Sequence, residues 1–300
     1  MSTFPTARTS VRGIEQVFTH LNPGGRGPSG AAPPLLLVHG WPETRRIWWR
    51  MLPPLAEAGY EVICPDLRGF GDSAVSPDGI HDVPTHSRDL HALCAELGHE
   101  RVVLVGGDLG GPVIQDLALR FPGFGERMVL FNSPLPFDAE RMAGMRTRPP
   151  MEAADYFIRQ GTDPDGLAAD LATPEARRRY IATFYTSRFW AHPGAFTADE
   201  VAFHTEPFAD AAKLRASFGG YESVFDESKR SEPPLMTRND ETPTMILFGP
   251  SDHVIYPEFD RMAATVFERR VGPFRLRDCG HFVQWEAADV LVSAIDAWLS

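Results

Sequence analysis

The chain has little cysteine and no long apolar run. Cys64, Cys94 and Cys279 are the only cysteines among 300 residues, and their odd number and wide spacing argue against a disulfide framework or a cysteine metal site. No segment is apolar for long enough to span a bilayer. The first ten residues lack the apolar stretch of a signal peptide. These features favour a cytoplasmic protein with reduced thiols.

Basic residues are also in the minority. The sequence has 29 Lys and Arg against 40 Asp and Glu, a net charge of −11, with no basic tail. Such a surface disfavours nucleic acid and anionic membranes, so neither is expected as a partner. Internal repeats and low-complexity tracts are absent as well. The sequence does not decide the oligomeric state, and a homodimer is one possibility.

Short apolar runs alternate with helical patterns along most of the chain. Continuous rather than alternating hydrophobicity is typical of parallel strands buried on both faces. The sequence therefore predicts an α/β fold, with a mostly parallel, doubly wound sheet flanked by helices and a site beyond the carboxyl ends of the strands. The expected strands cover residues 35–38, 61–64, 102–105, 128–131 and 245–248, and the expected helices residues 85–97, 112–120 and 289–299.

This alternation stops between Pro136 and Thr237. The intervening segment has no comparable strand run and is rich in helix-forming and aromatic residues. It is too long for a bare loop. We expect two domains: a core of residues 1–136 and 237–300, and a helical cap of residues 137–236 that covers the carboxyl edge of the sheet as a lid.

Asp108 is the most informative residue. It follows the run Val-Val-Leu-Val-Gly-Gly at 102–107 and precedes Leu109, Gly110 and a helical pattern. This layout is that of a nucleophile elbow, in which a sharp strand-to-helix turn exposes one side chain. Most elbows carry Ser. An Asp, ionised at neutral pH because its ordinary pKa is about 4, would attack an electrophilic carbon and leave an alkyl-enzyme ester. The alternative for Asp108 is a helix N-cap.

Two further motifs follow expected strands. His39-Gly40-Trp41-Pro42 comes after residues 35–38, so the backbone N–H of Trp41 can join that of Leu109 to bind a developing oxyanion. A plain structural turn is the alternative for this motif. His281 follows Gly280 after the last short apolar run, and Asp252 follows the strand 245–248. The order Asp108, Asp252, His281 is that of nucleophile, acid and histidine. The other candidates for the acid are Asp260 and Asp278, and a helix cap is the alternative for Asp252.

These motifs, together with Asp66-Leu-Arg-Gly-Phe-Gly-Asp-Ser73, resemble the α/β-hydrolase fold family, and specifically its epoxide hydrolase branch, over nearly the whole chain. The resemblance implies an α/β-hydrolase fold with an inserted helical lid, and a cis bond between Trp41 and Pro42. It also implies that His281, oriented by Asp252, activates the water that hydrolyses the ester. No metal and no organic cofactor are implied.

Leu109 helps to choose among enzymes that share an Asp elbow. Haloalkane dehalogenases typically carry Trp after the nucleophile, whose indole N–H donates to the departing halide. Fluoroacetate dehalogenases typically carry Arg there, which holds the substrate carboxylate. The side chain of Leu109 can do neither. Epoxide hydrolases hold the leaving oxygen with two lid donors, and Tyr156 and Tyr221 resemble these. Tyr180 and Tyr185 are interpreted as packed core, although either stays open as the first donor.

The resemblance thus predicts an epoxide hydrolase that converts a small-molecule apolar epoxide and water to a vicinal diol. The main alternative is a haloalkane or haloacid dehalogenase with the same nucleophile, and a remote one is a non-catalytic ligand-binding protein. Beyond Trp41 and Leu109, the expected walls of the substrate pocket are Phe137, Phe157, Phe282 and Trp285.

Overall fold

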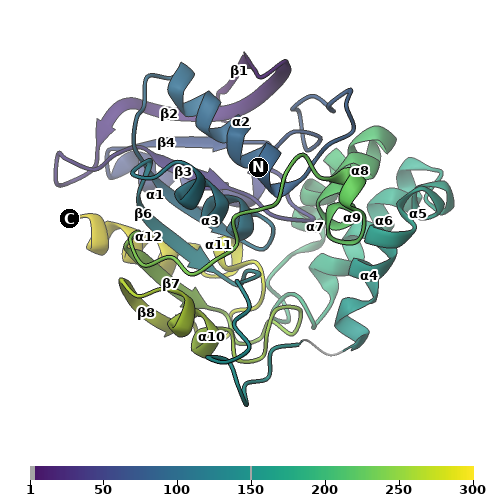
Figure 1. The fold of residues 1–300 in the computed structure, drawn as a ribbon. Coiled ribbons are helices and arrows are strands. Elements are labelled where there is room, and N and C mark those ends of the chain that lie inside the picture. The colour runs from purple at the N-terminus through teal and green to yellow at the C-terminus, as the bar shows by residue number, and fades with distance from the viewer. Residues whose placement is uncertain (1–3, 149–150) are drawn as a thin grey trace.

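The computed structural model describes residues 4–148 and 151–300. Its centre is an eight-stranded sheet in the order β1-β2-β4-β3-β5-β6-β7-β8 (Figure 1). The strands are β1 (Thr6–Val11), β2 (Ile14–Arg26), β3 (Leu35–Val38), β4 (Tyr60–Pro65), β5 (Val102–Gly107), β6 (Gly125–Phe131), β7 (Thr244–Phe248) and β8 (Arg270–Arg275).

The sheet is parallel except at one end. β1 pairs antiparallel with β2, and β2 antiparallel with β4, whereas the pairs from β4 to β8 are parallel. The five predicted strands are confirmed as β3 to β7, and each of them is largely buried. The hairpin of β1 and β2 was not predicted. In β1 exposed residues alternate with partly buried ones, whereas the first half of β2 is mostly buried and its second half mostly exposed.

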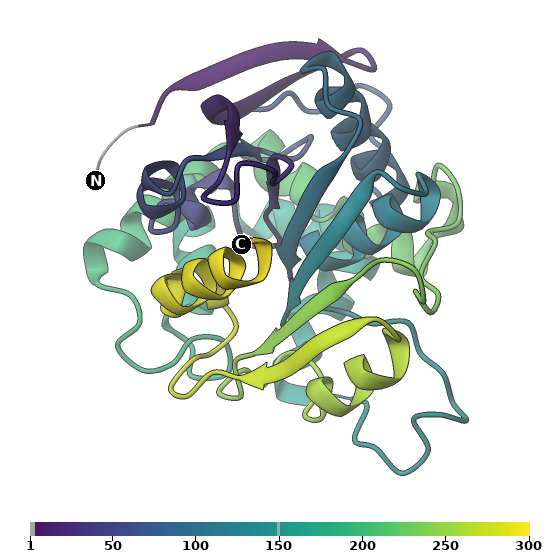
Figure 2. The same ribbon diagram turned by 90° about the vertical axis from the view of Figure 1, so that its left-hand side faces the viewer.

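Helices cover both faces of the sheet. In Figure 2 the sheet is turned so that α1 and α12 lie on one side and α2 and α3 on the other. The core helices are α1 (Leu52–Glu57), α2 (Val83–Glu96), α3 (Gly110–Arg120), α10 (Phe259–Val266), α11 (Val283–Glu286) and α12 (Ala288–Leu299), with the short 3₁₀ helix η1 (Arg45–Trp48). Because these helices shield both faces of the central sheet from water, its strands are apolar at nearly every position rather than at every second one. The predicted α/β-hydrolase architecture is confirmed.

Between β6 and β7 the chain forms helices and no strand within the described residues. They lie beside the sheet, at the right of Figure 1. They are α4 (Met151–Thr162), α5 (Pro164–Asp170), α6 (Pro174–Thr186), α7 (Ala198–Thr205), η2 (Glu206–Ala209), α8 (Ala211–Ser217), α9 (Gly219–Phe225) and η3 (Glu227–Lys229). A Cβ at Gly220 would lie 3.3 Å from the Leu109 side chain, so α9 packs directly over the turn after β5. No helix of the described residues is long and apolar enough to cross a membrane.

Candidate active site

Asp108 lies on a tight turn between β5 and α3. Its φ of 45° is left-handed, a costly conformation for a residue other than glycine. Glycine at two neighbouring positions makes room for this turn. A Cβ at Gly40 would lie 2.5 Å from the Asp108 Cβ, and one at Gly110 would collide with the Val38 carbonyl oxygen. The predicted elbow geometry is therefore present, with the carboxylate held at the carboxyl end of the sheet.

The two oxygens of the Asp108 carboxylate have different partners. The backbone N–H of Trp41 donates to Oδ1 at 2.6 Å, and His281 Nε2 lies 3.1 Å from Oδ2. The Asp108 residue is only 7% exposed. The Trp41–Pro42 bond is cis, as predicted. Leu109 occupies the N-cap position of α3 and its side chain makes no capping hydrogen bond, at the end of the helix where backbone N–H groups have no partner within the helix.

His281 bridges two carboxylates. Its Nδ1 lies 2.8 Å from Asp252 Oδ2, on the side away from Asp108. The other oxygen of Asp252 accepts from the backbone N–H groups of Val254 at 2.7 Å and Ile255 at 3.1 Å, which fix the carboxylate in place. The structure thus brings together Asp108, Asp252 and His281. The other two candidate acids lie elsewhere: Asp260 pairs with Arg275, and Asp278 is exposed.

The charges around His281 stabilise its protonated form. Burial alone would lower the pKa of this imidazole, because a buried cation loses hydration. The carboxylates of Asp252 and Asp108 outweigh that effect and raise the pKa well above its ordinary value. These contacts therefore favour the imidazolium form of His281 in this arrangement.

Tyr156 of α4 and Tyr221 of α9 lie over the nucleophile. Their ring centroids are 5.8 Å apart, and both rings pack on the indole of Trp41, at 5.4 Å and 5.6 Å. Burial raises the pKa of both phenols well above the ordinary value, and the negative charge of Asp108 raises it further. Both hydroxyls therefore stay protonated at neutral pH and can act as donors.

The other two lid tyrosines have partners of their own. The Tyr180 hydroxyl accepts from Gln160 Nε2 at 2.8 Å, and the Tyr185 hydroxyl donates to the Pro42 carbonyl at 2.6 Å. Neither lines the cavity above Asp108, whereas Tyr156 and Tyr221 do. This geometry favours Tyr156 as the first lid donor.

Two polar residues beside the site were missed by the sequence reading. Asn132, directly after β6, donates from Nδ2 to Asp252 Oδ2 at 2.9 Å, and its backbone carbonyl accepts from the Asp108 N–H at 2.9 Å. Glu43 is buried, and its two oxygens accept from the Gly40 N–H at 2.6 Å and from Gln284 at 2.7 Å. Asn132 directly follows a predicted strand and Glu43 directly follows the His39–Pro42 motif, but neither residue carries a sequence signal of its own.

The Glu43 carboxyl lies in an unusual environment. Burial, followed by the nearby charge of Asp108, raises its pKa to about 7. Carboxyl groups with a pKa raised toward neutrality are common close to active sites.

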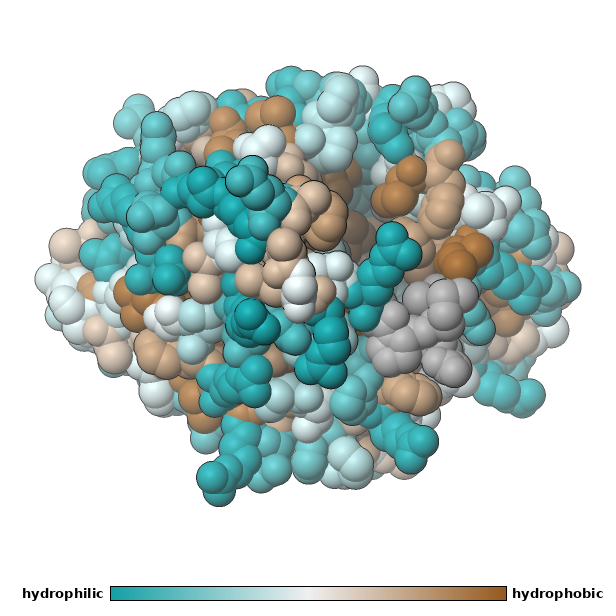
Figure 3. Space-filling model, turned by 60° about the horizontal axis from the view of Figure 1, so that its bottom comes forward, coloured by the Kyte–Doolittle hydropathy of each residue, from teal (hydrophilic) through white to brown (hydrophobic). Residues whose placement is uncertain are grey.

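A cavity of about 650 Å³ opens above Asp108 and is lined mainly by apolar side chains. Of the predicted walls, Leu109 and Phe157 line it, whereas Trp41, Phe137, Phe282 and Trp285 do not. Phe137 points to solvent, 67% exposed, while Phe282 and Trp285 pack with Phe196 behind His281. Those four wall predictions were wrong, because an aromatic residue near a motif in sequence can face the core or the solvent. On the face shown in Figure 3, hydrophobic side chains gather around a hollow in a mostly hydrophilic surface.

Comparisons with known proteins agree with this architecture. A family model described as "alpha/beta hydrolase fold" matches residues 33–288, so the chain belongs to the α/β-hydrolase fold family. The chain is 27% identical over 269 residues to the soluble epoxide hydrolase of Corynebacterium sp. (strain C12), covering 88% of this chain and 89% of that protein.

Solved structures share the fold. The epoxide hydrolase CorEH superposes with a TM-score of 0.79 at 23% identity, covering 97% of this chain and 96% of the other. The haloalkane dehalogenase DbeA from Bradyrhizobium elkani USDA94 gives a TM-score of 0.73 at 20% identity, covering 98% and 97%. At such identities the structures establish the common fold alone. The sequence relatives and the motifs together confirm the predicted resemblance to the epoxide hydrolase branch.

Proposed function

We propose that this protein is an epoxide hydrolase acting in two half-reactions on one carboxylate. The observation that carries the proposal is the arrangement of Asp108, with a buried His281–Asp252 pair on one side and two protonated tyrosines above it. The first step forms a covalent ester, and the second hydrolyses it to a vicinal diol.

In the first step, Oδ2 or Oδ1 of Asp108 attacks an oxirane carbon from behind, and the C–O bond of the ring breaks. Tyr156 and Tyr221 donate hydrogen bonds to the departing oxygen. One of the two phenols transfers its proton to this oxygen, which becomes a hydroxyl, and the phenol then regains a proton from solvent. The alkoxide charge develops in a buried, largely apolar site, where positioned donors act most strongly.

In the second step His281 changes its role. Esterification removes the negative charge of Asp108, one of the interactions that raise the pKa of His281. The imidazole then gives up its proton more readily and can accept one from water. That water attacks the ester carbonyl, and the oxyanion is held by the backbone N–H groups of Trp41 and Leu109. The intermediate then collapses: the bond from the carbonyl carbon to the alkyl oxygen breaks, His281 returns its proton to that oxygen, the diol leaves and the Asp108 carboxylate is regenerated. Asp252 keeps the Nδ1 proton in place throughout.

The helical insertion serves as the cap. We propose the division into a core of residues 1–136 and 237–300 and a cap of residues 137–236, because Tyr156 and Tyr221 reach the cavity from the insertion. The cavity of about 650 Å³ has room for a bulky apolar epoxide as well as a small one.

A dehalogenase would need donors aimed at a departing halide. Leu109 supplies no such side-chain donor, and the indole N–H of Trp41 donates to Ser217 at 3.1 Å within the protein. We therefore favour the epoxide.

Incubating the enzyme with matched panels of epoxides and haloalkanes tests this choice. We expect diol formation from bulky apolar epoxides and no halide release. Halide release without diol formation would refute the proposal, and tight binding of both panels without turnover would favour a ligand-binding protein.

A further inference from the structure

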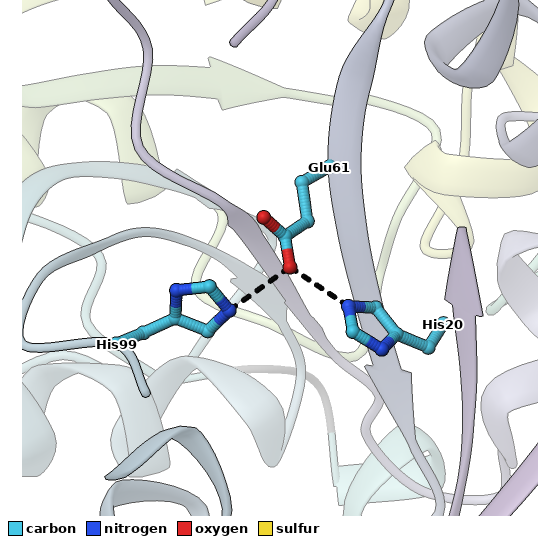
Figure 4. Close-up of side chains that lie close together, drawn as sticks. All are labelled: His20, Glu61 and His99. Carbon is cyan, nitrogen blue, oxygen red and sulfur yellow. Dashed lines mark hydrogen bonds and ion pairs between the residues drawn. The ribbon is translucent and has the colours of Figure 1, made fainter. Parts of the chain in front are cut away.

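Three metal-ligating side chains converge far from the candidate active site. They are His20 of β2, Glu61 of β4 and His99 of the loop between α2 and β5 (Figure 4). Glu61 Oε1 lies 2.8 Å from His20 Nε2 and 2.9 Å from His99 Nε2. One carboxylate oxygen thus lies between two imidazole nitrogens, and all three ligand atoms lie within 4.8 Å of one another.

The strand register explains why these residues meet. His20 pairs directly with Ile63 across the antiparallel β2–β4 ladder, so Glu61 is its diagonal neighbour on the same face. His99 is three residues before β5, and Glu61 is the second residue of β4. Both therefore lie at the amino ends of the parallel strands. Asp108 follows the opposite end of β5, so the six residues of that strand separate the two places by about 20 Å.

We propose that His20, Glu61 and His99 form a binding site for one divalent transition ion of the Zn²⁺ type, with water completing the coordination. Two imidazoles and one carboxylate are ligands that suit Zn²⁺. Metal–ligand bonds of about 2.0–2.1 Å place tetrahedral ligand atoms about 3.3 Å apart. The two contacts of Glu61 Oε1 with the histidine nitrogens therefore need to lengthen by only about half an ångström to admit the ion.

The surroundings of the cluster support an ion. The Gly24 backbone N–H donates to the second Glu61 oxygen, Oε2, at 2.8 Å, which turns Oε1 toward the two histidines. The Glu61 side chain is 3% exposed, whereas both histidine side chains are 18% exposed, so an ion can enter from solvent. An ion bound there links the antiparallel end of the sheet, through His20 and Glu61, to the loop before β5, through His99. Its role is structural and separate from the reaction at Asp108.

Zinc titration of untagged protein, first stripped with a chelator, tests the proposal. We expect competition with a chromophoric zinc indicator to show one tight ion per chain, and Zn²⁺ to raise the thermal unfolding midpoint. His20→Gln and His99→Gln should each weaken zinc affinity at least tenfold and abolish the thermal shift. The matched control is His91→Gln, because His91 is a half-buried histidine that stacks on Phe121 outside the cluster. It should behave like the unaltered protein.

A second measurement needs no variant. Co²⁺ added to the stripped, unaltered protein should give visible absorption of four- or five-coordinate cobalt at one equivalent, and Zn²⁺ should displace it. Zinc uptake no stronger than in the double variant His20→Gln/His99→Gln would overturn the proposal. So would an equal loss of affinity in His91→Gln, or a Co²⁺ spectrum no different from that of the aqueous ion.

Discussion

Replacing Asp252 with Asn should separate the two half-reactions. Oδ1 of Asp252 accepts from two backbone N–H groups, those of Val254 and Ile255. In the Asp252→Asn variant these donors hold the amide oxygen at that position, so the NH₂ group takes the place of Oδ2, 2.8 Å from His281 Nδ1. Nδ1 must then accept, and the single imidazole proton moves to Nε2. His281 can no longer take a proton from water.

The loss expected for a wrong imidazole tautomer is about 10³- to 10⁴-fold in kcat. Attack by Asp108 on the epoxide does not use that proton, so ester formation should slow less than tenfold. Rapid mixing with excess epoxide, acid quenching and intact-mass spectrometry should then show about one covalent adduct per chain in Asp252→Asn, and little in the unaltered enzyme.

The exposed acid Asp278 offers a matched control. Its φ of 55° is one that Asn tolerates, so Asp278→Asn should fold and turn over normally. The reasoning fails if Asp252→Asn keeps kcat within tenfold, if it loses activity without accumulating ester, or if Asp278→Asn has the larger effect.

Three further predictions concern residues around the site. The folded-state pKa of Glu43, about 7, exceeds the ordinary 4.5, so its stabilising contribution is complete below pH 4.5 and is lost as the pH rises through 7. The unaltered protein should therefore lose about 2 to 3 kcal/mol between pH 5 and pH 8 from this group, and Glu43→Gln should not, as measured by urea unfolding; equal slopes would contradict this. Tyr156→Phe or Tyr221→Phe should each slow ester formation about 10²- to 10³-fold in stopped-flow experiments, while Tyr180→Phe should not; similar rates in all three would count against the lid donors. Asn132→Ala should lower the free energy of unfolding by about 1 to 3 kcal/mol, because it leaves the buried Gly249 N–H without its partner; an unchanged urea midpoint would disprove this.

Much of the fold could be predicted because its information is local. The continuous apolar runs of β3 to β7 and the glycines around Asp108 specify buried strands and a sharp turn by themselves. The hairpin of β1 and β2 was missed because its identity depends on pairing with β4, a long-range contact. The helical insertion was predicted only as a whole, since its caps and lengths depend on packing.

In the candidate site, too, residues in local motifs could be predicted, whereas residues that depend on long-range contacts could not. Asp108 and His281 lie in recognisable local motifs, and Asp252 follows from chain order. Asn132 and Glu43 carry no local motif, and their importance appears only when β6, β7 and the turn after β3 meet in space. The wall predictions for Phe282 and Trp285 failed for the related reason that sequence does not reveal which way a side chain points.

The central claim is that Asp108 carries the reaction covalently. Its most direct test is a single turnover, with enzyme in excess over an epoxide, in water labelled with heavy oxygen. We expect the first diol to contain no label and the Asp108 carboxylate to gain one heavy oxygen, detectable by peptide mass spectrometry. Label in the first diol, with none in Asp108, would mean that activated water attacks the epoxide directly and would contradict the account.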